Sequence, residues 1–296
     1  MFRPSHVMNS GEQSVLPSTR LASAPAHVAV VQDSVSRTNP NQQRGLYRCL
    51  HRAAENELSR LVACRATGVR RLVYTSSIHA VAEPPQGTVI DESQPFDPDR
   101  ILGDYARSMA RATLLLLEEV RKGGLDAVIC CPTGVIGPWD YGISNIGQLI
   151  LDFASGYLKS YVSGAYDFVG VRDVAKGLIL AAEKGQPGHH YIFSGAQVQV
   201  PELMKELERN IGHPAPTYQI PAVIARAAGV LASVYYWLLR RRPVFTAYSI
   251  DVLRSNSLVS SARAREALGF TTRPWQESIR DHVEWFRSEG MLPIQR

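Results

Sequence analysis

The chain has 296 residues, of which 45% are hydrophobic and 20% are charged, and its formal net charge is +5. These values are ordinary for a globular protein and leave room for one large domain or two modest ones. The basic residues are scattered apart from Arg70-Arg71 and Arg240–Arg242, and no nucleic-acid-reading motif accompanies them, so no nucleic-acid partner is predicted.

The amino-terminal segment differs in composition from the rest of the chain. Its first fifty residues are rich in Ser, Pro and Arg, and Glu12 and Asp33 are their only acidic residues. We interpret residues 1–25 as a disordered leader, with an organelle transit peptide as the alternative. No signal-peptide core is present, so the sequence predicts a cytoplasmic protein.

Four cysteines occur, Cys49, Cys64, Cys130 and Cys131, and none forms a CxxC pair. The adjacent pair falls in a predicted strand, where neighbouring side chains point to opposite faces. That arrangement suits neither a shared metal nor a disulfide, so we expect reduced, partly buried thiols in an intracellular protein.

Strands and helices alternate in the first half of the chain. Strands are predicted at residues 26–31, 71–76 and 127–131, and amphipathic helices at residues 46–67 and 104–122. Asp104 is expected to cap the second helix, and Gly123-Gly124 to end it. Continuous apolar strands that alternate with amphipathic helices predict an α/β protein with a parallel, helix-covered sheet.

The second half is more mixed. Turn residues at 132–141 predict a loop, and a short strand is expected within residues 161–171. Asp173 is interpreted as the cap of the helix that follows it. The remaining predictions are helices at 145–157, 173–184, 200–211, 262–268 and 275–289, a long apolar helix after residue 211, and a strand at 190–193.

Several short motifs follow one another in a fixed order. They are Val69–Ser77, Tyr105–Ser108, Pro132–Pro138, Phe168–Ala175, Ser194-Gly195 and the ending Glu284–Phe286. Each motif is weak alone, but their order over some 240 residues resembles the extended short-chain dehydrogenases/reductases. Within that superfamily the chain is most similar to the NAD-dependent epimerase/dehydratase group, which includes 3β-hydroxysteroid dehydrogenase-like and dihydroflavonol-reductase-like proteins.

The resemblance implies a doubly wound parallel (Rossmann-like) sheet and a smaller carboxy-terminal part that closes over the substrate. Residues 26–143 would form the remainder of the NAD(P)-binding domain. Residues 144–296 would form a mixed substrate-binding region, with some segments returning to the sheet. By the same resemblance, the helices at 46–67 and 104–122 would pair in a homodimer.

The resemblance also implies a site. Ser77 would bind the reacting oxygen and Tyr105 would transfer its proton, leaving hydride chemistry to NAD or NADP. The substrate would be a lipophilic or sugar-like small molecule. Thr75, Ser76 and Tyr105 would contact the cofactor, and Pro132, Thr133, Gly134 and Val135 would line the nicotinamide pocket.

Three departures from the family pattern affect this reading. Met109 stands where the family has a lysine, whose charge lowers the pKa of the catalytic tyrosine from about 10. Before Ser77 there is no Gly-rich turn, and residues 26–31 best fit the family's fourth strand, so we expect the first half of the nucleotide-binding domain to be absent or replaced. Ala53 stands where the family has a supporting asparagine.

Two functions therefore remain open. One is an NAD(P)-dependent oxidoreductase or epimerase/dehydratase that acts at a carbinol or carbonyl carbon. The other is a catalytically impaired remnant or binding scaffold.

His79 either faces the pocket or is a polar residue without a role in the site, and His189-His190 has no metal-ligand partner at a suitable spacing. The apolar segment with its arginines at 227–242 either contacts a membrane surface, covers a lipophilic pocket or packs in the core.

Overall fold

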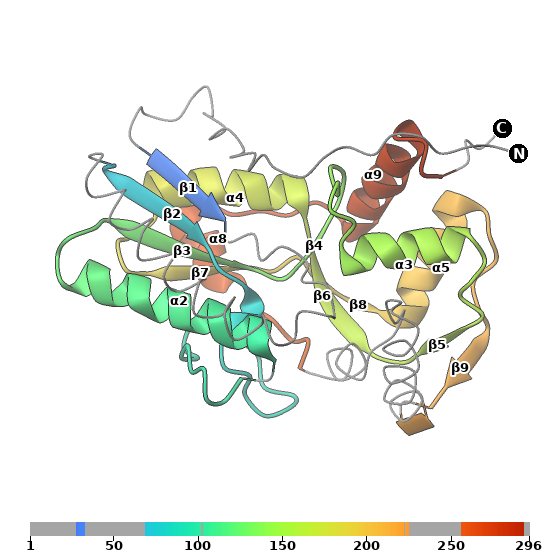
Figure 1. Ribbon diagram of the computed structural model, residues 1–296, viewed down its shortest axis with the longest axis horizontal. Coiled ribbons are helices and arrows are strands. Elements are labelled where there is room, and N and C mark those ends of the chain that lie inside the picture. Colours follow the sequence, from blue (N-terminus) through green and yellow to red (C-terminus); the bar gives the residue numbers. More distant parts are fainter. Residues whose placement is uncertain (1–27, 33–68, 102, 222, 225–255, 293–296) are drawn as a thin grey trace, which may run out of the picture.

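A computed structural model of the chain describes residues 28–32, 69–101, 103–221, 223–224 and 256–292 (Figure 1). Several sequence predictions lie outside the described residues. They are the leader at 1–25, the helix at 46–67, most of the apolar segment at 227–242, and the positions of Ala53, Cys49 and Cys64. Within the described ranges, no helix is both long and apolar enough to cross a membrane.

The main sheet has four parallel strands in the order β1-β2-β3-β7. Their bounds are Val28–Gln32 for β1, Arg71–Thr75 for β2, Ala127–Pro132 for β3 and His190–Phe193 for β7. All four predicted strands are therefore confirmed, as is the α/β class. Because the strands are parallel, the chain leaves every one of them at the same edge of the sheet (Figure 1).

The sheet is buried on both faces. Leu72 and Tyr74 belong to the apolar cluster that includes Leu116 of helix α2 (Asp104–Arg121). Val73 points to the opposite face, where its cluster includes residues of α4 (Val171–Lys184) and α8 (Ala262–Leu268). Figure 1 shows α2 on one side of the strands and α4 on the other, so helices cover both faces of β2 and β3.

Two predicted helix caps are wrong. Helix α2 begins at Asp104 itself, and its N-cap is Gly103, whose φ of 94° suits glycine. Helix α4 begins at Val171, two residues before Asp173, with Gly170 as its N-cap. Both aspartates lie in a first helical turn instead, where their charge is favourable beside the helix dipole.

A second body packs around a three-stranded sheet in the order β4-β6-β8. These strands are β4 (Gly134–Ile136), β6 (Ala165–Gly170) and β8 (Ala196–Gln199), and a further pair joins β5 (Ser160–Val162) to β9 (Tyr218–Ile220). The predicted loop at 132–141 is thus partly wrong, since β4 gains its partner from a strand some thirty residues away.

Three helices complete the second body. They are α3 (Asn145–Ala154), α5 (Val200–Ile211) and α9 (Trp275–Ser288), and Figure 1 shows them beside the smaller sheet. Helix α5 begins with a capping box. The Gln199 side chain accepts a hydrogen bond from the Glu202 amide, and the Glu202 side chain accepts one from the Gln199 amide. The shared cluster of this body includes Phe153, Leu207 and Phe286.

Cys130 and Cys131 are free thiols on β3, and both are fully buried. Burial raises the pKa of both thiols, so they stay protonated at neutral pH. The prediction of reduced, buried cysteines is confirmed for this pair.

The protonation of His190 on β7 is coupled to the stability of the fold, because the ring is largely buried. Its ring lies edge-on to Phe96 at 4.8 Å, and within the described structure its Nε2 atom is buried without a hydrogen-bond partner. Burial lowers the pKa of His190 from 6.5 to about 4, and the charges of Arg263 and His189 contribute in the same direction.

We predict that the protein loses stability as the pH falls from 6.5 to 4. The unfolded chain takes up a proton at His190 below pH 6.5, whereas the folded chain does not until about pH 4, a difference of roughly 3 kcal/mol. Urea unfolding at several pH values measures the effect. His190→Gln should flatten this slope, and the exposed His189→Gln should flatten it much less, because burial is the main cause of the shift. Equal slopes in both variants would contradict the assignment.

Candidate functional site

The carboxyl end of β2 carries three consecutive hydroxyl residues. The Ser76 amide continues the pairing with β3 by donating to Cys130 O at 2.8 Å. The Ser76 and Thr113 hydroxyls lie 2.8 Å apart, and Thr113 donates to Met109 O, so Ser76 is the donor to Thr113. Thr75 is buried, and among the described residues its hydroxyl oxygen has no hydrogen-bond partner.

Ser77 begins a single 3₁₀ turn, η2 (Ile78–Ala80). Its Oγ accepts a hydrogen bond from the His79 amide at 3.2 Å. Since the hydroxyl accepts this bond, its own hydrogen remains available to donate. The turn packs against α2, the helix that carries Tyr105 in its first turn.

Tyr105 lies in the first turn of α2 and is 43% exposed. Met109, one turn further on, is 1% exposed and belongs to the apolar cluster of that sheet face. Its thioether supplies neither a charge nor a strong donor. Arg107 donates to Ile101 O at 3.0 Å and lies 3.9 Å from Asp104, so its cation is directed toward the loop before the helix.

The segment after β3 approaches the same edge of the sheet. Pro132 ends β3, and Thr133 binds Phe193 O of the neighbouring strand through its amide at 3.1 Å and its hydroxyl at 3.3 Å. Gly134 and Val135 then enter β4, where Val135 is 37% exposed. The bonds of Thr133 fix where this segment leaves the sheet.

Gly134 lets the aromatic side chains of the neighbouring strand β6 lie close to the main chain of β4. An alanine Cβ at this position would lie 2.4 Å from Cε1 of Tyr166 and 2.8 Å from Cδ1 of Phe168. Both aromatic rings come from β6, and Phe168 is the register partner of Gly134. The ring of Tyr166 therefore rests directly against the glycine main chain.

Tyr166 also contacts the turn that follows β2. Its hydroxyl lies 2.7 Å from Nε2 of His79, and the two ring centroids are 6.0 Å apart. Burial lowers the pKa of His79 below 6.5, so the imidazole is neutral at neutral pH. Sequence reasoning weighed His79 without a partner and missed Tyr166, because nothing local in the chain links two positions 87 residues apart.

The buried carboxylate of Asp167 joins strand β6 to the residues that follow β7. Asp167 accepts hydrogen bonds from the Ser194 hydroxyl at 2.9 Å and the Gly195 amide at 3.2 Å. Burial raises the pKa of Asp167 above its usual range, although bonds from Thr133 and Ser194 oppose that rise. The motif Ser194-Gly195 thus has a structural role, which is to tie β7 to β6.

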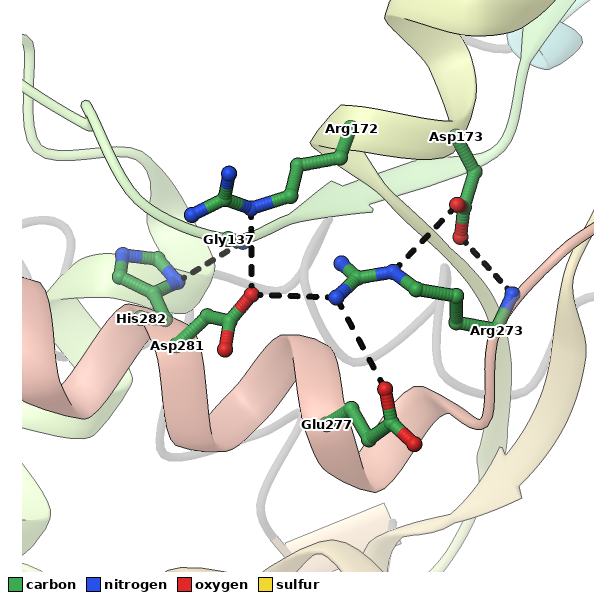
Figure 2. Close-up of polar contacts among 7 residues, drawn as sticks. All are labelled: Gly137, Arg172, Asp173, Arg273, Glu277, Asp281 and His282. Atoms are coloured by element: carbon green, nitrogen blue, oxygen red, sulfur yellow. Dashed lines mark hydrogen bonds and ion pairs between the residues drawn. The ribbon is translucent and has the colours of Figure 1, made fainter.

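Figure 2 shows a charged network near the start of α9. Asp173 accepts a hydrogen bond from the Arg273 amide at 3.1 Å and lies 3.5 Å from its Nε. Arg273 and Arg172 both contact Asp281 Oδ2, at 3.3 and 3.2 Å. Asp173 therefore anchors the segment before α9 to α4, and this bond replaces the helix cap that the sequence predicts.

A buried histidine of α9 holds the loop after β4. His282 Nδ1 accepts a hydrogen bond from the Gly137 amide at 3.2 Å (Figure 2). Its Nε2 lies 3.5 Å from Asp140 Oδ2. Burial would raise the pKa of Asp140, but hydrogen bonds from His282 and Ser144 outweigh it and hold that pKa low. The two ring nitrogens of His282 therefore contact the loop at two points, Gly137 and Asp140.

The sequence-predicted site residues follow the ends of β2 and β3 or lie on α2, which contacts η2. Ser77 offers a hydroxyl donor and is 8% exposed, and Tyr105 offers a phenol that is 43% exposed. Together, a donor and a phenol can polarise a carbonyl oxygen or take the proton of an alcohol. No group of three potential metal ligands occurs in the described part of the chain.

Comparison with known protein families gives a match over more than half of the chain. The model of the NAD dependent epimerase/dehydratase family matches residues 25–193. The chain is 37% identical over 233 residues to sterol demethylase protein B of Methylococcus capsulatus, covering 77% of this chain and 70% of that protein.

A second relative has a related name. The chain is 28% identical over 247 residues to 3beta-hydroxysteroid-dehydrogenase/decarboxylase isoform 1 of Arabidopsis thaliana. That alignment covers 76% of this chain but only 55% of the plant protein.

Solved structures show the same fold. The crystal structure of gox2253 superposes with a TM-score of 0.75 at 26% identity, over 90% of this chain and 80% of that one. The structure of RMD from Pseudomonas aeruginosa complexed with NADPH gives a TM-score of 0.67 at 18% identity, over 92% and 84%.

We predict that Gly134→Ala destabilises the protein by about 1–3 kcal/mol, because its methyl group would displace the rings of Tyr166 and Phe168. Thermal unfolding followed by circular dichroism measures the loss. Gly142→Ala is the control, since a Cβ there would meet no atom within 4 Å. A Gly134 variant as stable as the Gly142 variant would show that the rings move aside freely.

Proposed function

Because the chain belongs to the NAD-dependent epimerase/dehydratase family, we propose that it binds NAD or NADP at the carboxyl edge of its parallel sheet. We further propose that it acts as an oxidoreductase at a carbinol or carbonyl carbon of a lipophilic substrate. The observation that carries the proposal is the packing of the Ser77 turn against the helix of Tyr105. In this proposal residues 26–143 hold the cofactor, and residues 144–296 supply most of the substrate site.

The residues at this edge suit the nicotinamide half of a dinucleotide. The buried Thr75 hydroxyl has no partner among the described residues, so it is available to a polar group of a bound ligand. Thr75, Ser76, Tyr105 and the segment 132–135 would hold the cofactor there. Open α/β sheets bind dinucleotides at the carboxyl ends of their strands.

The chain's own residues would manage the substrate oxygen. Ser77 donates a hydrogen bond to that oxygen, while the His79 amide holds the hydroxyl from behind. Tyr105 takes the proton of the substrate hydroxyl during oxidation and returns it during reduction. The bound nicotinamide would exchange the hydride with the carbinol carbon.

A sterol-like substrate is the class that we favour. Two of the similar relatives carry names that refer to sterols or hydroxysteroids, and one of them is 37% identical to this chain. Sugar-nucleotide epimerases are also similar in fold, but at 18–24% identity. Exposed apolar side chains near the site, such as Val135, favour a lipophilic substrate over a sugar.

A second candidate function is supported by one observation. Met109 is buried among apolar side chains and offers Tyr105 no positive charge. A tyrosine without a neighbouring cation is a poor base at neutral pH. The alternative is therefore a protein that binds nucleotide and substrate but turns over slowly or not at all.

We predict that the protein binds NADH or NADPH. Titration at constant protein concentration should give a saturable change in cofactor fluorescence, with dissociation constants below millimolar. Thr75→Val replaces the buried hydroxyl with a methyl group of similar size and should weaken binding several-fold. Gly142→Ala provides the control, because that position is open and was not assigned to the cofactor site. The absence of saturation with either nucleotide would reject cofactor binding.

We predict that Met109→Lys raises the oxidation of a 3β-hydroxysteroid at pH 7 by roughly a hundredfold, the lower range for general acid–base catalysis. The added amine would lie one helical turn from Tyr105 and favour its phenolate. Steady-state production of NADH measures the gain. Met109→Leu, which changes packing without charge, should leave turnover unchanged.

The gain should depend on the tyrosine. Adding Tyr105→Phe to the Met109→Lys protein should return the rate to that of the original chain. A gain that persists without the phenol would show that Tyr105 is not the proton carrier, and a folded lysine variant with no gain would show that Met109 is not the defect.

A further inference from the structure

Two contacts connect Tyr166 to the hydroxyl of Ser77. The Tyr166 hydroxyl lies 2.7 Å from Nε2 of His79, and the His79 amide donates to Ser77 Oγ at 3.2 Å. The ring of His79 is thus held by Tyr166 of the smaller sheet, and the amide of His79 holds the hydroxyl of Ser77. We propose that Tyr166 is a positioning residue, which fixes the Ser77 turn through His79 so that the serine hydroxyl donates toward the substrate oxygen.

Tyr166 is suited to this role because its own position is fixed. It lies on β6, which pairs with β4 on one side and β8 on the other. Its ring packs against Phe168 at a centroid distance of 5.2 Å and rests on the main chain of Gly134. A ring packed against Phe168 and the Gly134 main chain has little freedom to follow movements of the turn, so it restrains the turn instead.

The Ser77 turn needs such a restraint. The 3₁₀ helix η2 has only three residues, and helices of this kind are short and weakly bonded. If the His79 amide moved away, Ser77 Oγ would lose the donor that leaves its hydrogen directed outward. The hydroxyl could then rotate, and its donation to a substrate oxygen would no longer be preorganised.

The neutral state of His79 agrees with this arrangement. A neutral imidazole has one donor and one acceptor nitrogen, so Nε2 can share a hydrogen with the phenol in either tautomer. Burial keeps the pKa of His79 below its ordinary value. The pair therefore persists at neutral pH without bringing a charge beside Ser77.

The first test needs no cofactor and no turnover. Hydrogen exchange of the His79 amide, followed by NMR in the complete chain, should be about tenfold faster in Tyr166→Phe, in line with the loss of one hydrogen bond. Ser77→Ala should accelerate the same amide by a similar factor. Tyr161→Phe is the matched control, because Tyr161 is a partly buried strand tyrosine of the same body and should leave the amide unchanged.

This inference rests on the proposed function only in its second test. In the protein that turns over a 3β-hydroxysteroid, Tyr166→Phe should lower kcat about tenfold with little change in KM, because the serine acts on the transition state. In a Ser77→Ala background the same substitution should have no further effect, since the two residues act through one contact.

The outcomes separate the two proposals. An unchanged His79 amide in Tyr166→Phe or in Ser77→Ala would overturn the positioning role, whatever the activity. Additive losses of kcat, or a loss confined to KM, would also overturn it, because Tyr166 would then act on the substrate directly. Fast amide exchange in both variants, together with no turnover in any form, would support the positioning role and reject the proposed reaction.

Discussion

The parallel pairing of β2, β3 and β7 is the constraint on which the rest of this structure depends. Strands that run the same way end at the same edge, so the hydroxyl run after β2, the segment after β3 and Ser194-Gly195 after β7 are brought together without any sequence proximity. The hydrogen bond between Ser76 and Thr113 then joins that edge to α2. The turn that follows Ser77 also contacts this helix, which carries Tyr105 in its first turn.

The second body is attached to this edge by specific contacts rather than by a large apolar surface alone. Asp167 binds the residues that follow β7, and the Tyr166 hydroxyl lies 2.7 Å from His79 Nε2 in the turn that follows β2. At the far end of the smaller sheet, Asp173 and Arg273 hold the start of α9 against α4. Each contact is buried or partly buried, and each unites segments that are distant in the sequence, so the two bodies have one defined orientation near the site.

Most of the regular elements could be predicted from the sequence because their signals are local. The bounds of β7, α5 and α8 agree with those read from apolar periodicity, turn residues and helix starts. Strand β4 could not be predicted, because its three residues are extended only by pairing with β6. The caps were misassigned because Gly103 and Gly170 adopt the required backbone without a side-chain bond. At the site, Ser77 and Tyr105 can be recognised as parts of a motif. The role of Tyr166 cannot, because it depends on a contact with His79, which is distant in the sequence.

The burial of Met109 has a consequence for how this chain changes over generations. The apolar cluster accepts the flexible thioether of Met109 without the desolvation cost of a buried ammonium, so folding by itself does not favour a lysine at this position. Selection for a stable, abundant protein would therefore not preserve the amine once selection for turnover was relaxed. A single substitution at such a position removes a charge from the site while leaving the architecture intact.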